Sequence, residues 1–486
     1  MKDYSFGNYI CALRMGLGLS QFQLGTLVGV TDKAVSKWEN GNAKPKISTC
    51  RRLAEVLGVT LTELLSCEQY TTTSARKELD KMNQRLWKQA YERLSIYGKN
   101  PPAACWSRLA TEETAFYGTD AVQSFAVLGK VRKAAQECDS DIMVTGAINS
   151  SYAAWLFGAT TVNPLQPHYR CPTCGNIEFV SDIADGFDLA PKSCICGEHL
   201  LRDGHNIPFE GYAKSVQNGS WIDVRVSDSF MARAAEVLKD FYKDTAEILP
   251  VRIIGNSQEE NLDIYVVLPG NKIKPELSED GFWHTTMDKY WDWREGETSF
   301  SFYADDSLNR IEQLVKKRGV VLPNAAELAN KAIMEQLFRS RLEKYPAFDE
   351  KLGKNGVQNF DLLMRMDGFR LGSWDCNNIP EMIGKMNIGF LDAPAFREDV
   401  WNDIAGALTN KGINENGLAL LVMDLATKGK FYWKRVPEEI FSLLSSLALP
   451  NWYLDYLSTV MYLFPKGHCV ALLIKEMLEI WLREKV

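Results

Sequence analysis

The sequence has no uninterrupted apolar run long enough to cross a membrane as a helix, and no targeting segment opens it. These absences exclude a membrane-spanning protein and lead us to expect a cytoplasmic location. Closely spaced cysteines are also scarce, because most of the 11 stand alone along the chain. Isolated cysteines remain thiols in a reducing compartment, so the pattern argues against a disulfide framework.

Over most of the chain, Lys and Arg are outnumbered by Asp and Glu. The formal net charge is −7, and residues 1–67 hold eight Lys and Arg against five Asp and Glu, which leaves −10 for the remainder. A body of this charge is poorly suited to follow a phosphate backbone, although a local groove could still be basic. The length of 486 residues and the 46% hydrophobic content are those of a soluble globular protein with two or three domains.

Four cysteines do lie close together, within residues 163–210. They are Cys171, Cys174, Cys194 and Cys196. Two such pairs, each on a turn that aims both sulfurs at one point, supply the four thiolates of a tetrahedral zinc site. The second pair has one intervening residue where the usual knuckle has two. We therefore predict structural zinc and leave three alternatives open: completion by His199 or His205, a strained site, or reduced cysteines without metal.

Residues 6–66 have the pattern of a small helical domain. Ser20 is placed to cap one helix, and Thr31 a second helix that ends near Glu39. The apolar residues expected to form the core are Leu24, Leu27, Val30, Val35, Trp38, Leu53, Val56, Leu57, Leu61 and Leu64. The order of cap, turn glycine and WENG ending resembles the Cro/repressor-type helix-turn-helix family.

This resemblance implies that the second helix enters the major groove of double-stranded DNA while the first touches phosphate. Carried over by position, the residues that face bases are Asp32, Lys33 and Lys37 with Ser36 beside them, and those that face the backbone are Gln21, Asn40 and Lys44. We expect an operator read by a homodimer, since such domains bind half-sites about one helical turn apart. The alternative is a helical domain used for protein contact, against which its basic charge argues.

Residues 67–77 contain a Thr-Thr-Thr-Ser run and predict a linker. From residue 75 to about residue 97, a helix is expected to carry one apolar stripe. The stripe consists of Leu79, Met82, Leu86, Ala90 and Leu94. Docking of this helix on its own body is favoured over dimerisation, because the stripe is short for a coiled coil.

Three segments follow one another through the cysteine-rich stretch: NPLQPHYRCPTCG, GFDLAPKSC and RDGHNIPFE. They resemble consecutive palm motifs of the PolC-type alpha subunit of bacterial DNA polymerase III. The resemblance continues to finger motifs, of which LPNWYLDYLSTVMYLFPKGH is the clearest. It does not include the PHP, OB and proofreading exonuclease modules of that enzyme, or the segments that grip duplex DNA and the sliding clamp.

The expected fold is multidomain: an all-α helix-turn-helix head joined to an α+β polymerase-like palm with a zinc-knuckle insertion and helical fingers. The expected bounds are 1–67 for the head, 68–104 for a linker and helix, 105–340 for the palm with its knuckle at 163–210, and 341–486 for the fingers-like region.

The resemblance implies a palm that holds two metal ions with an Asp-x-Asp pair on one strand and a third Asp on a neighbouring strand. Here Trp221 stands at the first position, Asp223 at the second, and Phe300 aligns with the third. Arg225, two residues along the strand, would compensate the charge of Asp223. We expect a site without its metal carboxylates, in which Trp221 and Phe300 pack together.

The phosphate-binding loop of that family, Ser-Arg-Gly-Ser-x-Gly-Ser-Ser, is also altered. Residues 144–151 keep Gly146 and the two final serines but lack the arginine and the second glycine. Lys466 and His468 match the finger motif, and packing of a helix start would equally explain them. Weak nucleotide binding is the most that this loop predicts.

The primary hypothesis is a DNA-binding transcriptional regulator whose polymerase-like body is inactive and serves sensing or partner binding. One alternative is a phage-defence or replication-interference protein whose body mimics the replicative polymerase core and captures a replication or phage protein. Another is an enzyme with residual nucleotidyltransferase, polymerase or nuclease activity, against which the altered carboxylates argue.

Overall fold

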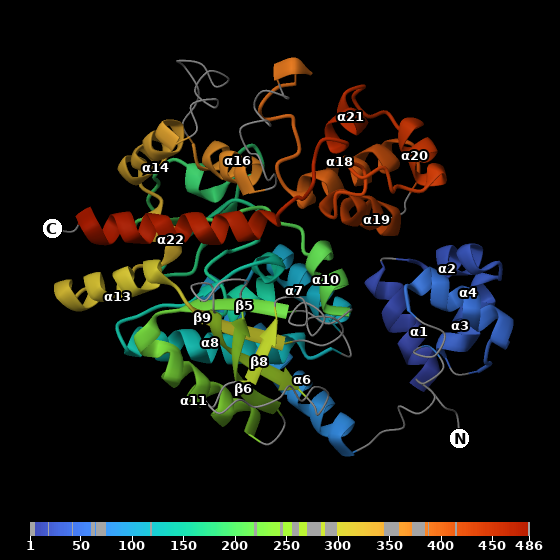
Figure 1. Ribbon diagram of the computed structural model, residues 1–486, viewed down its shortest axis with the longest axis horizontal. Helices are drawn as coiled ribbons and strands as arrows, with labels where there is room; N and C mark the ends of the chain where they lie inside the picture. Colours follow the sequence, from blue (N-terminus) through green and yellow to red (C-terminus); the bar gives the residue numbers. More distant parts are fainter. Residues whose placement is uncertain are drawn as a thin grey trace.

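The computed structural model shows a small helical head beside a larger body of helices and strands (Figure 1). It describes residues 5–17, 19–40, 42–59, 64, 74–116, 119–217, 221–243, 246–254, 262–269, 283–286, 299–344, 359–371, 384–386, 388–413 and 416–484. None of the helices in these ranges is long and apolar enough to cross a membrane.

The head is built from α1 (Ser5–Gly16), α2 (Gln21–Val28), α3 (Asp32–Glu39) and α4 (Ile47–Leu57). Both predicted caps are confirmed. The Ser20 hydroxyl accepts from the Gln23 N–H at 3.1 Å, and the Thr31 hydroxyl accepts from the Ala34 N–H at 3.2 Å. Between the two helices, Gly29 takes a φ of +81°, which glycine adopts without steric cost.

The predicted head core is largely confirmed. Leu24, Val35, Trp38, Leu53, Leu57 and Leu64 are buried, Val30 and Val56 are half-buried, and Leu61 lies outside the described residues. The prediction for Leu27 was wrong, because its side chain is 46% exposed. Val28, the last residue of α2, is buried in its place, since the helix turns this neighbouring position toward α3 and α4.

The body contains a mixed sheet in the order β1-β5-β9-β7-β6-β8 among the described strands. The strands are β1 (Met143–Val144), β5 (Trp221–Val226), β6 (Ala246–Ile254), β7 (Leu262–Pro269), β8 (Trp283–Thr286) and β9 (Ser299–Ala304). The β5–β9 and β6–β8 pairs are parallel, and the other pairs are antiparallel. A short strand, β1, therefore lies beside β5 at one edge of the sheet.

Helices α8 (Ala121–Glu137) and α11 (Met231–Tyr242) pack on one face of this sheet. Their buried side chains meet those of the strands in one apolar core, which includes Val122, Phe125, Val131, Ala234, Leu238, Ile222, Val224, Phe300 and Phe302. Alternation along β5 sends Asp223 and Arg225 to the opposite face. We call this opposite face, at β5 and β9, the palm face.

Helix α6 (Ser74–Glu92) continues into a 3-10 turn at Arg93–Tyr97 and is followed by α7 (Ala103–Ala115). Leu86, Ala90 and Leu94 are buried in the same core as α8, and Met82 is partly buried there. The Leu79 side chain lies outside the described residues. Docking of this helix on its own body is therefore confirmed for the part of the stripe that is described.

A second sheet, in the order β3-β2-β4, carries the cysteine-rich stretch. Its strands are β2 (His168–Arg170), β3 (Ile177–Phe179) and β4 (Leu201–Asp203), paired antiparallel. Two short helices flank this stretch in the sequence, α9 (Tyr152–Leu156) and α10 (Glu210–Gln217).

The elements described after β9 are helical. The α-helices among them are α13 (Asp306–Arg318), α14 (Lys331–Lys344), α16 (Phe360–Leu371), α18 (Arg397–Asn410), α19 (Asn416–Thr427), α20 (Glu438–Ser445), α21 (Tyr453–Leu457) and α22 (Lys466–Glu484). Helix α22 passes through the middle of the body (Figure 1) and buries Val470, Leu473 and Met477 in a core shared with α13, α14 and α16. This position brings the start of α22 to the palm face.

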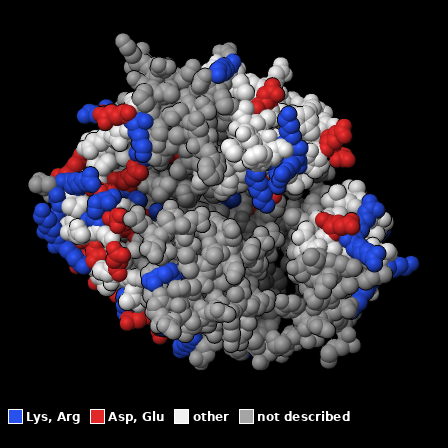
Figure 2. Space-filling model, in the orientation of Figure 1, with Lys and Arg blue, Asp and Glu red and all other residues white. Residues whose placement is uncertain are grey.

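The head contacts the body through α1, which lies next to α7 and α10. The carbonyl oxygen of Leu17 is also close to Gly417 of α19, 3.1 Å from where a Cβ would stand. Helix α3 lies on the side of the head away from the body (Figure 1), and Figure 2 shows Lys and Arg side chains along that outer side.

Candidate functional site

The surface of α3 presents the residues expected to read DNA. Asp32, Lys33 and Lys37 are exposed, and Ser36 is half-buried beside them. Asp32 also accepts a hydrogen bond from the Lys33 N–H at 2.8 Å, where a carboxylate stabilises the start of a helix. The side chains assigned to base contact therefore share one accessible helix.

The residues expected to face the DNA backbone differ from one another in exposure and in hydrogen-bond partners. Asn40 and Lys44 are exposed, and the Asn40 amide donates to the Ser36 carbonyl oxygen at 2.9 Å. Gln21 donates to Glu39 at 2.7 Å, and Glu39 also pairs with Arg14 at 2.5 Å. The Gln21 amide thus supports a buried ion pair that ties α1 to α3, a role that the sequence analysis missed.

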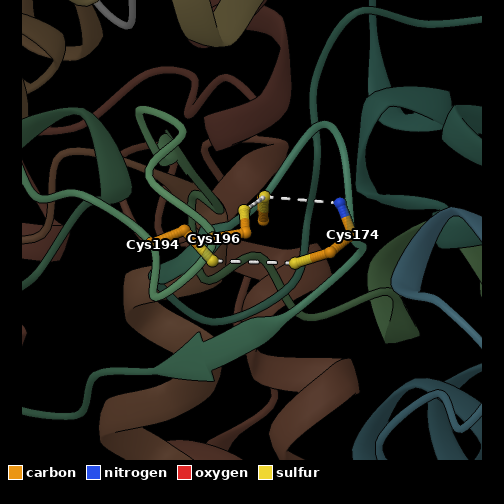
Figure 3. Close-up of side chains that lie close together, drawn as sticks. Cys174, Cys194 and Cys196 are labelled. Atoms are coloured by element: carbon orange, nitrogen blue, oxygen red, sulfur yellow. Dashed lines mark hydrogen bonds between the residues drawn. The ribbon is translucent and has the colours of Figure 1, made fainter.

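The four cysteine sulfurs converge, all within 4.8 Å of one another (Figure 3). The Cys171 and Cys196 sulfurs are 3.6 Å apart, as are those of Cys174 and Cys194. A tetrahedral zinc ion with Zn–S bonds of about 2.3 Å would set its sulfurs about 3.8 Å apart. The donor set and its spacing therefore fit structural zinc.

Backbone geometry explains how a pair with one spacer residue can take part. The Cys194 N–H donates to the Glu198 carbonyl at 2.8 Å, and Gly197 turns the chain with a φ of +89°. In the first pair, a hydrogen bond from the Cys174 N–H is the main cause that lowers the pKa of Cys171 to about 6. A lowered pKa favours the thiolate, which is the form that binds metal.

Neither histidine considered for this site belongs to the converging group. His205 is fully buried, its Nδ1 lies 2.9 Å from the Asp185 carboxylate, and its ring packs edge-on against Phe187. His199 is exposed, beside Glu198 on the turn. Both histidines therefore lie outside the group of four sulfurs that could hold a metal ion.

The strand register corrects the expected palm site. Phe300 pairs with Ile222 in the parallel β5–β9 ladder, and its side chain is buried in the helix-covered core, 6.4 Å from the Tyr242 ring centroid. Side chains alternate between faces, so Phe300 and its partner Ile222 share the helix-covered face and Phe300 does not line the palm face. The Trp221 side chain lies outside the described residues, so its packing against Phe300 stays a prediction.

The register puts Ser301 opposite Asp223 and Tyr303 opposite Arg225, on the palm face. Arg225 donates to Asp305 at 2.9 Å and lies over the Tyr303 ring, 5.2 Å from its centroid. Burial alone would raise the pKa of Asp305, but hydrogen bonds from Ser307 and Arg225 lower it to about 2. The palm face thus carries an arginine ion pair next to Asp223.

The start of helix α22 lies near this face and packs against residues 146–149. His468 accepts a hydrogen bond from the Gly146 N–H at 3.2 Å, and burial followed by the charge of Arg225 lowers the pKa of His468 to about 4. Gly467 fits against Asn149, where a Cβ would stand 2.7 Å from the Asn149 Cβ. The start of α22 and the altered phosphate loop therefore pack directly together.

At the start of α9, a buried carboxylate accepts hydrogen bonds from the N–H groups that a bound phosphate would need. Glu112 accepts from the Ser151 hydroxyl at 2.8 Å, the Tyr152 N–H at 2.8 Å and the Ala153 N–H at 3.0 Å. Arg108 pairs with it at 2.7 Å. The role of Glu112 could not be predicted from the sequence, because nothing in the local pattern links it to a loop nearly 40 residues away.

Comparison with known proteins agrees with this two-part architecture. Residues 12–64 match the family described as "Helix-turn-helix". The chain is 24% identical over 476 residues to "DNA polymerase III PolC-type" of Lactococcus lactis, covering 80% of this chain and 28% of that relative. The corresponding values are 26%, 77% and 30% for the Ureaplasma parvum protein, and 27%, 79% and 32% for that of Thermotoga petrophila.

The chain thus spans about a third or less of the length of these relatives. The matches nevertheless cover more than three quarters of this chain, and the helix-turn-helix match covers α2, α3 and α4. The protein is therefore a fusion of a Cro/repressor-type helix-turn-helix domain with a body similar to part of the PolC-type DNA polymerase III.

Proposed function

We propose that the protein is a sequence-specific DNA-binding regulator of transcription, and that its polymerase-like body is an inactive module for sensing or partner binding. The observation that carries the proposal is the free outer surface of α3, where Asp32, Lys33 and Lys37 are exposed. The head–body contact uses α1 and Leu17, so it leaves this surface accessible to a major groove.

Selection of bound sequences from random duplex DNA tests this function. The full-length protein should enrich one motif, with half-sites about 10 base pairs apart if two heads bind together. A variant with Lys33→Ala and Lys37→Ala should enrich none, whereas Arg233→Ala, at an exposed ion pair on α11, should enrich the same motif. A protein that enriches no motif, or the same motif in both variants, does not read DNA through α3.

Inactivity of the body is supported by the groups that now occupy the palm face. The register places Ser301 where a carboxylate would face Asp223, and Arg225 holds Asp305. Within the described ranges, the four cysteines are the only group of three or more potential metal ligands that converge. A positive guanidinium beside Asp223 opposes the binding of a divalent cation.

We also propose structural zinc in the cysteine site. Bound zinc would hold Cys171 and Cys174, which follow β2, against the turn at Cys194 and Cys196, and so fix the position of this hairpin. The metal would serve folding here, because all four ligand positions are filled by protein.

A second candidate, interference with replication, is favoured by exposed aromatic side chains in the fingers-like region. Trp433 is 53% exposed, Phe441 44% and Tyr462 41%. Aromatic residues are enriched in protein interfaces. If the body captures a replication or phage protein, Trp433→Ser should abolish copurification of that protein. The control Leu473→Met, at a buried position, should leave copurification unchanged.

A further inference from the structure

A cavity lies beside strand β2 and is lined by none of the palm-face residues discussed above. It has a volume of about 710 Å³ and is bounded by the end of α6, the loop after α9, strand β2 and residues 322–325. This volume lies within the usual range of small-molecule sites. The chain segments that meet here are far apart in the sequence, so the fold as a whole shapes the cavity.

Arg170 of β2 lines this cavity, and one of its nitrogens has no partner among the described residues. Only 9% of the residue is exposed, and its Nε is shielded from solvent without a hydrogen-bond partner. Arg132 lines the same cavity but is held by Asp141 at 2.7 Å and by the Gly158 carbonyl at 2.9 Å. A buried N–H donor without an acceptor is costly, so an acceptor group on a bound ligand would be favoured here.

Other groups around the cavity suit a ligand with both phosphate and a flat ring. Arg93 donates to the Leu156 carbonyl at 3.1 Å and keeps further N–H groups for an anion. Thr161 and Asn324 supply neutral polar groups, and Trp155 is half-buried at the wall. Arginine binds phosphate through paired N–H groups, while an indole offers a face for a base.

The adjoining cleft extends this positive surface. It has a volume of about 610 Å³, and it shares Arg93 and Arg132 with the first cavity. Its remaining lining adds Arg85, Lys130, Lys133 and Lys243 against a single acidic residue, Asp240. Such a concentration of positive charge in a chain of net charge −7 favours a ligand that carries several negative charges.

We propose that the joined cavities bind a nucleoside polyphosphate, with its phosphates on Arg170 and Arg93 and its base against Trp155. A nucleic-acid strand fits less well, because Arg170 is nine-tenths buried and lines a cavity. The inference names the ligand that the body would sense. Binding itself does not depend on the proposed sensing role; only the reason for binding rests on that proposal.

Thermal-shift and calorimetric titrations of the full-length protein, without DNA, test the proposal. The probes are ATP, GTP, CTP and UTP, with inorganic tripolyphosphate, adenosine and a 12-nucleotide single strand for comparison. At saturation at least one nucleotide should raise the melting temperature by at least about 2 °C. Tripolyphosphate should bind more weakly, and adenosine should not bind.

Arg170→Met separates ligand binding from a structural role. It should weaken nucleotide binding at least about tenfold while leaving the melting temperature of the unliganded protein unchanged or higher, because it removes a buried N–H donor that has no acceptor. Arg93→Gln, at an exposed position, should weaken binding as well, and Trp155→Leu should weaken nucleotides but not tripolyphosphate. Arg233→Met, on the surface of α11, is the matched control and should change nothing.

Three results would overturn the proposal: no nucleotide binds, Arg170→Met binds as tightly as the unmodified protein, or only the single strand binds. Equal binding of tripolyphosphate and all four nucleotides would overturn the assignment of a base site at Trp155. Loss of operator binding in the α3 variants would leave these titrations unchanged, so failure of the DNA-binding proposal and failure of this one are distinguishable.

Discussion

Arg225 and Asp305 form an ion pair on the palm face, with 2.9 Å between Nη1 and Oδ2. The same carboxylate accepts from the N–H groups of Ser307 and Leu308, and so caps α13. One side chain thus joins strand β5 to the helix that follows β9. A carboxylate held by an arginine and a helix start contributes to the stability of the fold and is not free to hold a metal ion.

Asp305→Ala should lower the free energy of unfolding at neutral pH by about 1–2 kcal/mol, the usual cost of losing a helix cap. Because the folded pKa of Asp305 is about 2, below the value of an unfolded aspartate near 3.9, this contribution is complete above about pH 4. It is lost as the pH falls toward 2.

Urea denaturation at several pH values measures this difference. The gap between the unmodified protein and Asp305→Ala should narrow as the pH falls below about 4, whereas Asp306→Ala, at an exposed neighbouring position, should show little gap at any pH. A gap that stays constant down to acid pH would mean that the charge of Asp305 is not what stabilises the fold.

Phe300 should matter for stability and not for catalysis. Phe300→Ala should cost about 3–5 kcal/mol in chemical denaturation, because it empties a position in the core beneath α8 and α11. Phe300→Leu, which keeps most of the volume, should cost less than about 1.5 kcal/mol. Near-equal stability of Phe300→Ala and the unmodified protein would show that Phe300 is not in this core.

The sequence allowed the head to be predicted almost residue by residue, because caps, turn glycine and core positions are local signals. The prediction for Leu27 failed, because whether Leu27 or Val28 is buried depends on where α2 ends. The convergence of the cysteines was also predictable from their spacing. The face of Phe300 was not, because one residue of register moves a side chain to the other side of a sheet.

The contacts of Glu112, Arg170 and Asp305 were beyond sequence reasoning for a related reason. Glu112 lies far along the chain from the α9 N–H groups that it accepts hydrogen bonds from, and Asp305 lies far along the chain from its ion-pair partner Arg225. Arg170 is informative because its Nε has no hydrogen-bond partner among the described residues. Only the assembled fold brings such relationships into view.

Purified protein should contain about one zinc ion per chain, held by four thiolates. Cys171→Ser should release the metal and speed proteolysis of the hairpin around β2, because metal binding and local folding are coupled. Cys138→Ser, at an exposed cysteine outside the cluster, is the control and should retain zinc. Elemental analysis of anaerobically purified protein that finds less than about half an equivalent would count against the site.

The unmodified protein should not extend a primer on a template with Mg²⁺ or Mn²⁺. Polymerase chemistry depends on two metal ions held by carboxylates, whereas Ser301 and Arg225 now flank Asp223. Trp221→Asp together with Phe300→Asp should also be inactive, since Phe300 faces the apolar core. Template-dependent incorporation that Asp223→Ala abolishes would disprove the inactivity of the body.

The role of the head is tested most directly by quantitative footprinting on the DNA upstream of its own gene, with Lys37→Ala and Lys44→Ala compared. Lys37 is assigned to a base and Lys44 to the backbone, and both are exposed. Lys37→Ala should lose about 1–3 kcal/mol on the preferred site and relax the sequence preference there. Lys44→Ala should weaken all sequences alike and lower the salt dependence by about one ion. Identical footprints for the unmodified protein and both variants would contradict DNA recognition by α3.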